Sequence, residues 1–129
     1  MAKPGVATTD LTVKQMFDEA NGYNRTKFAE YEKNKIPYSE TLRLQTEREK
    51  KQLAAKYAVI ASTRSELAGE DLYYLGLLHW IAENYDGTTE SLLKFTSHET
   101  ASPERAQTAR SIIGVVYAKQ KKLTEAEKV

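Results

Sequence analysis

The chain has 129 residues, of which 40% are apolar and 29% are charged, and its 19 Lys and Arg against 18 Asp and Glu leave a net charge of +1. That length suits one folded domain, and the near-neutral charge argues against a nucleic-acid partner. The sequence contains no cysteine, which excludes disulfides, thiolate metal sites and a thiol nucleophile within this chain. No run approaches the roughly 18 apolar residues of a membrane-spanning helix, so we expect no membrane partner.

The first residues, 1–9, carry Pro4 and Gly5 without any periodicity, and we expect a flexible leader there. They lack the charged-then-apolar pattern of a secretory signal, but removal of a signal would leave the same kind of start. A cytoplasmic and an extracytoplasmic location therefore both stay open.

Residues 10–68 predict an amino-terminal helical hairpin. Thr12 and Gln15 have the spacing of a capping box, in which a hydroxyl and an amide satisfy the free backbone N–H groups at a helix start. Apolar side chains then recur at helical intervals as far as Tyr31. Asn21-Gly22 interrupts this face, so we expect a kink or a break at that point.

The second helix of this hairpin is expected to begin at Ser39, as its N-cap, after Ile36-Pro37 has ended the preceding segment. It is predicted to run to Ala68, with Gly69 as the left-handed residue that follows the helix. Its first half, residues 41–52, is nearly all polar and is expected to stand in solvent.

The rest of the chain predicts four more helices. Residues 70–84 are apolar nearly all round, which indicates a helix sandwiched between neighbours. A turn over residues 86–89 is expected to lead into a short helix, and Ser102-Pro103 supplies the N-cap and first residue of the next. Thr124 and Glu127 predict a second capping box that begins the last helix. No strand pattern occurs, so the sequence predicts an all-α fold of five to six helices.

Two parts of residues 69–129 resemble each other, because residues 72–88 can be laid over residues 110–126 without a gap. Each part has an apolar helix with a glycine, then a turn, then a capped second helix. This pattern resembles the tetratricopeptide repeat family, which implies antiparallel helix-turn-helix units in an α–α superhelix, the second unit being truncated. The positions that would carry the repeat packing are Leu75, Gly76, Ile113, Gly114, Tyr117 and Ala126.

A glycine inside an apolar helix costs about 1 kcal/mol relative to alanine, so Gly76 and Gly114 each predict the close approach of a neighbouring helix. The last unit stops inside its second helix, so we expect the chain to be the amino-terminal fragment of a larger protein. A separate catalytic module would then lie downstream, a thioredoxin-like redox domain being one candidate. The cut end would also leave an apolar surface that suits a homodimer.

Catalytic chemistry has little support in the sequence. The two histidines, His79 and His98, lie on different predicted helices, and Ser97-His98-Glu99 are neighbours in sequence that do not face each other on a helix. No motif for a metal, a nucleotide or another cofactor occurs. We therefore predict no catalytic residue, no metal ligand and no cofactor.

The remaining candidate for function is a surface. In the family that this sequence resembles, the first helix of each unit lines a groove for extended peptides. Carried over position by position, that groove would be lined by Tyr73, Leu77, Trp80, Ile81, Ser111, Val115, Ala118 and Lys119. The same side chains would also be explained by packing on the helix that begins at Ser39.

We therefore expect a non-catalytic helical scaffold that binds an unidentified protein or peptide. Trp80 and Tyr73 are residue types that anchor interfaces. A homo-oligomerisation module and a small enzyme with an unrecognised site remain as alternatives.

Overall fold

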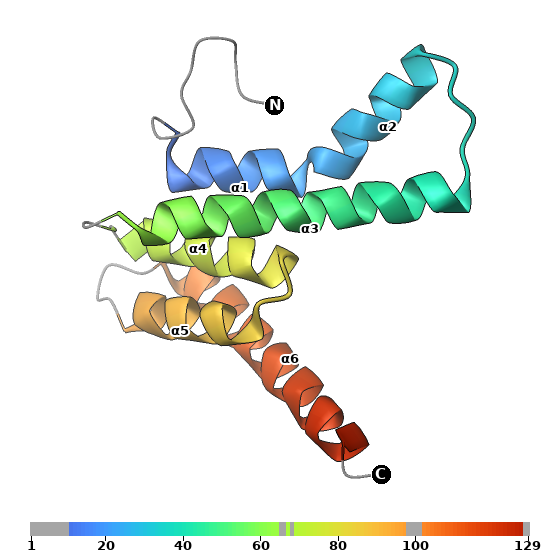
Figure 1. Cartoon of the computed structure of the whole chain (residues 1–129). Helices are drawn as coiled ribbons and strands as arrows, with labels where there is room; N and C mark the ends of the chain where they lie inside the picture. The colour runs from blue at the N-terminus through green and yellow to red at the C-terminus, as the bar shows by residue number, and fades with distance from the viewer. Residues whose placement is uncertain (1–10, 65–66, 68, 98–101, 128–129) are drawn as a thin grey trace.

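The computed structural model describes residues 11–64, 67, 69–97 and 102–127, the last six of them by their backbone alone. These residues form six α-helices and no strand, so the all-α prediction is confirmed (Figure 1). The predicted leader, residues 1–9, lies outside the described residues. The helices are α1 (Val13–Asn21), α2 (Tyr23–Lys33), α3 (Glu40–Ser62), α4 (Gly69–Ile81), α5 (Tyr85–Thr96) and α6 (Pro103–Glu127).

Helix α4 lies at the centre of the fold and packs against α1, α3 and α5 (Figure 1). Its residues Tyr74, Leu75 and Leu78 belong to a core cluster with buried side chains of α1 and α3. On its other side, Leu72 and Tyr73 pack against a second cluster formed by α5 and α6. A helix that is apolar nearly all round needs cover on both sides, and the prediction of a sandwiched helix is confirmed.

The start of α1 and its boundary with α2 follow local sequence signals. The Thr12 hydroxyl accepts a hydrogen bond from the Gln15 backbone N–H at 3.0 Å, and the Gln15 side chain accepts one from the Thr12 N–H at 2.9 Å. This is the predicted capping box. Gly22 then ends α1 and precedes α2, so the predicted interruption at this glycine is also confirmed.

Helix α3 begins as predicted, because the Ser39 hydroxyl accepts a hydrogen bond from the Leu42 N–H at 3.1 Å. It ends at Ser62, however, and the prediction that it runs to Ala68 is wrong. The Ser62 and Thr63 hydroxyls donate to backbone carbonyls at 2.9 and 2.7 Å, and such bonds compete with continuation of the helix. Gly69 is the first residue of α4 rather than a cap on α3.

The amino-terminal half of α3 extends beyond the core together with α2, and we call these two segments the arm (Figure 1). The prediction that residues 41–52 stand in solvent is only partly right, because α2 covers one side of them. Thr46 is fully buried there, with its hydroxyl 3.4 Å from that of Tyr31. The Phe28 ring contacts the rings of Tyr31 and Tyr38 farther along the arm.

The turn between α4 and α5 lies earlier than predicted. Helix α4 ends in a Schellman motif, in which the Asn84 N–H donates to the His79 carbonyl and Glu83 adopts a left-handed φ of 62°. The Asn84 side chain then accepts from the Gly87 N–H at 3.2 Å and so caps α5. Residues 86–89, which the sequence predicted as the turn, therefore form the first turns of α5.

Helix α6 begins at Ser102-Pro103 as predicted, with the Ser102 hydroxyl accepting from the Arg105 N–H at 3.2 Å. It continues without interruption to Glu127, so the prediction of a turn and a new helix at Thr124 is wrong. Residues 118–123 contain no glycine or proline, and good helix formers there favour continuation. The second predicted unit is a single helix and not a hairpin.

The two glycines that the resemblance made equivalent lie in unlike surroundings. Gly76 is buried, and a Cβ atom there would lie 2.5 Å from Leu92 Cδ2. Gly114 lies on the exposed side of α6, where an added Cβ atom would meet nothing within 4 Å. The predicted close approach is therefore confirmed at Gly76 and wrong at Gly114.

The other predicted packing positions divide in the same way. Leu75 is buried in the first cluster and Ile113 in the second, whereas Tyr117 is 50% exposed. The Ala126 side chain lies outside the described residues.

This difference predicts opposite effects for one substitution at two sites. Gly76→Ala should destabilise the protein by about 1–2 kcal/mol, because overpacking against fully buried Leu92 outweighs the gain in helix propensity. Gly114→Ala should stabilise it by up to about 1 kcal/mol. Urea denaturation followed by circular dichroism measures both changes, and shifts of the same sign would contradict the packing described here.

Candidate functional site

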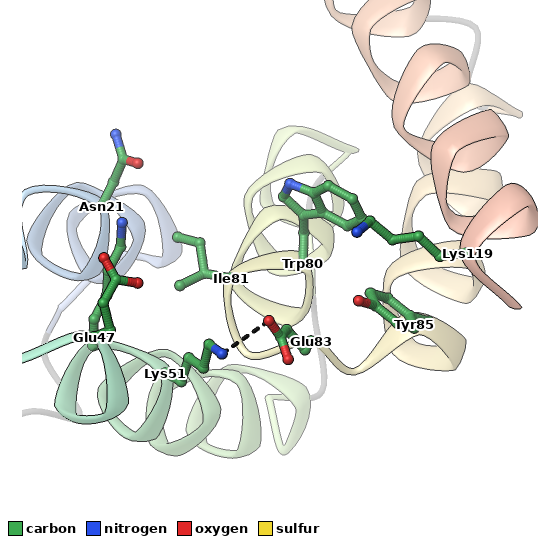
Figure 2. Close-up of a pocket in the computed structure, with 9 residues that line it drawn as sticks. Asn21, Glu47, Lys51, Trp80, Ile81, Glu83, Tyr85 and Lys119 are labelled. Atoms are coloured by element: carbon green, nitrogen blue, oxygen red, sulfur yellow. Dashed lines mark ion pairs between the residues drawn. The ribbon is translucent and has the colours of Figure 1, made fainter. Parts of the chain in front are cut away.

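A hollow of about 370 Å³ opens beside the turn between α4 and α5 (Figure 2). Its lining residues come from five helices, α1, α3, α4, α5 and α6, and from the turn itself. On this side of the fold α3 and α6 diverge from each other (Figure 1). We call this space the hollow. Its lining residues are Asn21, Glu47, Lys50, Lys51, Trp80, Ile81, Glu83, Tyr85 and Lys119.

The floor of the hollow is aromatic. Trp80 lies in the last turn of α4 and Tyr85 is the first residue of α5, and their ring centroids are 6.0 Å apart. The Schellman turn between them reverses the chain, which brings both rings to the same side. Both residues are half-buried, as is neighbouring Ile81, so apolar surface of all three reaches solvent.

An ion pair crosses one side of the hollow. Lys51 Nζ lies 2.9 Å from Glu83 Oε1, and the hydrogen bond and charge of Glu83 raise the pKa of Lys51 (Figure 2). Glu83 holds the left-handed backbone position that ordinarily favours glycine. The turn that forms the aromatic floor therefore also places Glu83 beside Lys51.

Two further ammonium groups face the hollow from different helices. Lys50 is half-buried on α3, and Lys119 reaches from α6 toward Trp80 (Figure 2). Within the described part of the chain, neither lysine forms an ion pair with a carboxylate. Glu47, the remaining charged residue of the lining, accepts a hydrogen bond from the Asn24 amide at 2.8 Å. The hollow thus combines an aromatic floor with basic groups on two walls.

Three of the eight predicted groove residues line this hollow, namely Trp80, Ile81 and Lys119. Tyr73 and Leu77 do not, because the Tyr73 ring packs against Tyr74 and Phe95 and Leu77 is buried in the first core cluster. Tyr73 and Leu77 are therefore packing residues and not groove residues, which is the alternative that the sequence left open. Leu77 packs in the cluster that includes α3, whereas the Tyr73 ring packs toward Phe95 of α5.

The remaining predicted positions, Ser111, Val115 and Ala118, are exposed on α6 but do not line the hollow. Sequence reasoning missed the contribution of α3, although Glu47, Lys50 and Lys51 have the three- and four-residue spacing of one helix face. That face was interpreted as solvated, and nothing in the sequence shows that the end of α4 lies beside it.

A second, smaller hollow of about 180 Å³ includes His79, Glu90, Ser91 and Lys94 among its lining residues. His79 Nδ1 lies 3.3 Å from the Asn84 amide nitrogen, a distance that suits donation from the amide to an unprotonated ring nitrogen. This places His79 against the cap of α5 rather than against a nucleophile.

In residues 11–64, 67, 69–97 and 102–127, no group of three or more potential ligands among His, Cys, Asp and Glu could hold a metal ion. None of the helices that the structure describes has the length and apolar character needed to cross a bilayer. His98 lies outside the described residues.

The surroundings of His79 predict a pH effect on stability. Burial lowers the pKa of His79, and the nearby charge of Glu90 opposes this more weakly. The folded protein therefore prefers the neutral ring, and this stabilisation is complete above about pH 6.5 and is lost as the pH falls below it. Between about pH 7.5 and 5.5, the wild-type protein should lose more stability than His79→Gln, as urea denaturation would show. His98 is present in both proteins, and equal losses would contradict the role given to His79.

No protein-family model matches the chain, and neither the curated proteins nor the solved structures include one with significant similarity to it. Any function of the hollow therefore depends on the chemistry of its own lining residues.

Proposed function

We propose that this chain is a non-catalytic helical scaffold that binds another protein, and that the hollow is its binding surface. The observation that carries the proposal is the pair of half-buried aromatic rings, Trp80 and Tyr85, held in a concavity open to solvent. Tryptophan and tyrosine are, with arginine, the residue types enriched among the side chains that anchor interfaces, and the rim around such anchors is polar.

The shape of the fold supports the same function. The arm and α6 extend away from the α4–α5 turn in different directions, so a partner that enters the hollow also meets two exposed helical surfaces (Figure 1). The α4–α5 hairpin has the close contact that the sequence predicts at Gly76, but α6 forms no second hairpin, so the likeness to a tetratricopeptide repeat is limited to one helix pair.

Self-association is the second candidate, and it is favoured by a different surface. Val115 and Tyr117 on α6 are 45% and 50% exposed, which is high for large apolar side chains. The two residues are two positions apart and lie on nearly opposite sides of α6, so burial of either one against a second copy would be the alternative use of this helix. Sedimentation velocity at several protein concentrations separates this candidate from binding of another protein.

A photo-crosslinking residue in place of Lys119 tests the proposed function. It should capture a partner protein, whereas the same residue in place of Val59, which is 65% exposed and lies outside the hollow, should not. The captured partner would then be identified, purified and titrated against the protein by calorimetry.

Trp80→Ala should weaken binding of that purified partner by about thirtyfold or more, the effect expected of an anchor residue. Leu93→Ala serves as the control, because Leu93 is 47% exposed on α5 and does not line the hollow. Circular dichroism at the titration temperature checks that both variants are folded. Equal affinities of folded Trp80→Ala and the wild-type protein would contradict the proposal.

A further inference from the structure

We propose that the hollow binds an internal acidic segment of the partner. One large apolar side chain of this segment would lie on Trp80, between the lining residues of α3 and Lys119 of α6. This inference rests on the proposed function and adds the chemistry of the ligand. Side-chain carboxylates of the segment would pair with Lys50 and Lys119, on either side of the aromatic floor.

The charge of the lining favours an acidic ligand. Three lysines and two glutamates face the hollow, and the ion pair of Lys51 with Glu83 neutralises one charge of each sign. The Glu47 carboxylate accepts a hydrogen bond from Asn24, which occupies part of its acceptor capacity. Lys50 and Lys119 are thus left, within the described residues, as donors without a carboxylate acceptor. Hydrogen bonds between an ammonium group and a carboxylate are about twice as strong as neutral ones.

The size and floor of the hollow favour an apolar side chain as the anchor. A volume of about 370 Å³ lies near the lower end of the range of about 300–1,000 Å³ for ligand pockets. That space suits one or two side chains of an extended segment rather than a folded element. Trp80, Ile81 and Tyr85 supply apolar surface that such a side chain would remove from water.

The position of Glu83 gives the hollow a built-in opposing charge. The Glu83 carboxylate lies 2.9 Å from Lys51 Nζ, so Lys51 is paired before any ligand arrives. Removing this carboxylate would free a third ammonium group for the ligand. Neutralising Glu83 should therefore tighten binding of an acidic segment, whereas loss of Lys50 and Lys119 should weaken it.

Trp80 is the single tryptophan of the sequence, so its fluorescence reports on the hollow alone. The test titrates the whole chain with three series of short peptides that differ in charge, acidic, neutral and basic. Each series carries leucine, phenylalanine or tyrosine as its apolar centre. All peptides have blocked ends, so that any response comes from side chains and not from a chain terminus.

The acidic series should change the Trp80 fluorescence and bind more tightly than the other two, and added salt should weaken it. The double change Lys50→Glu and Lys119→Glu should lower its affinity by about tenfold or more. The matched control, Lys56→Glu with Lys121→Glu, alters the net charge equally at exposed positions of α3 and α6 outside the hollow. It should have a much smaller effect, and Glu83→Gln should raise the affinity.

Several outcomes would overturn this inference. These are tighter binding of the neutral or basic series, no binding by any series, equal losses in the two double variants, and a fluorescence change caused by self-association alone. If the partner captured through position 119 binds by a segment without carboxylates, the inference fails while the proposed function stands. If neither peptides nor a captured partner contact the hollow, both fail.

Discussion

The fold depends on one constraint, which is that α4 is apolar nearly all round and must be covered on both sides. Leu75 and Leu78 need the face formed by α1 and α3, and Tyr73 needs the face formed by α5 and α6. Gly76 lets α5 approach closely enough to place Leu92 where any larger side chain of α4 would collide. A helix with one polar face would have needed neighbouring helices on its apolar side only.

The hollow forms at the end of α4, where the neighbouring helices no longer cover it on both sides. α3 and α6 diverge from each other at the end of α4 (Figure 1), so the last aromatic residue of α4, Trp80, is left half-buried. The tight Schellman turn adds Tyr85 to the same surface and places Glu83 beside Lys51. The hollow thus lies at the edge of the hydrophobic core. Packing in the core sets the positions of the helices that supply its aromatic floor and its charged side chains.

Local signals in the sequence were reliable wherever a side chain caps a helix directly. Thr12, Ser39 and Ser102 all begin helices where their patterns predicted, because each hydroxyl satisfies a nearby backbone N–H. The capping pattern at Thr124 misled, because the residues before it favour continuation of α6. The repeat comparison was right about the packing of Gly76 and wrong about Gly114, since spacing alone does not show which face of a helix is covered.

The candidate site was predictable in part. Trp80, Ile81 and Lys119 were found through the resemblance, and they lie together in the structure. Lys50 and Glu83 were not found, because their role depends on α3 packing beside α4 and on a turn without glycine. Such juxtapositions are set by tertiary packing and have no periodicity that a sequence displays.

The most direct measurement of the central claim is native-state hydrogen exchange, which resolves the stability of each helix separately. If α4 is the helix that both core clusters share, the backbone N–H groups of residues 75–78 should exchange only through global unfolding. Those of α2, which has no fully buried side chain of its own, should exchange through local opening at much lower free energy. Protection of α4 no greater than that of α2 would contradict the account.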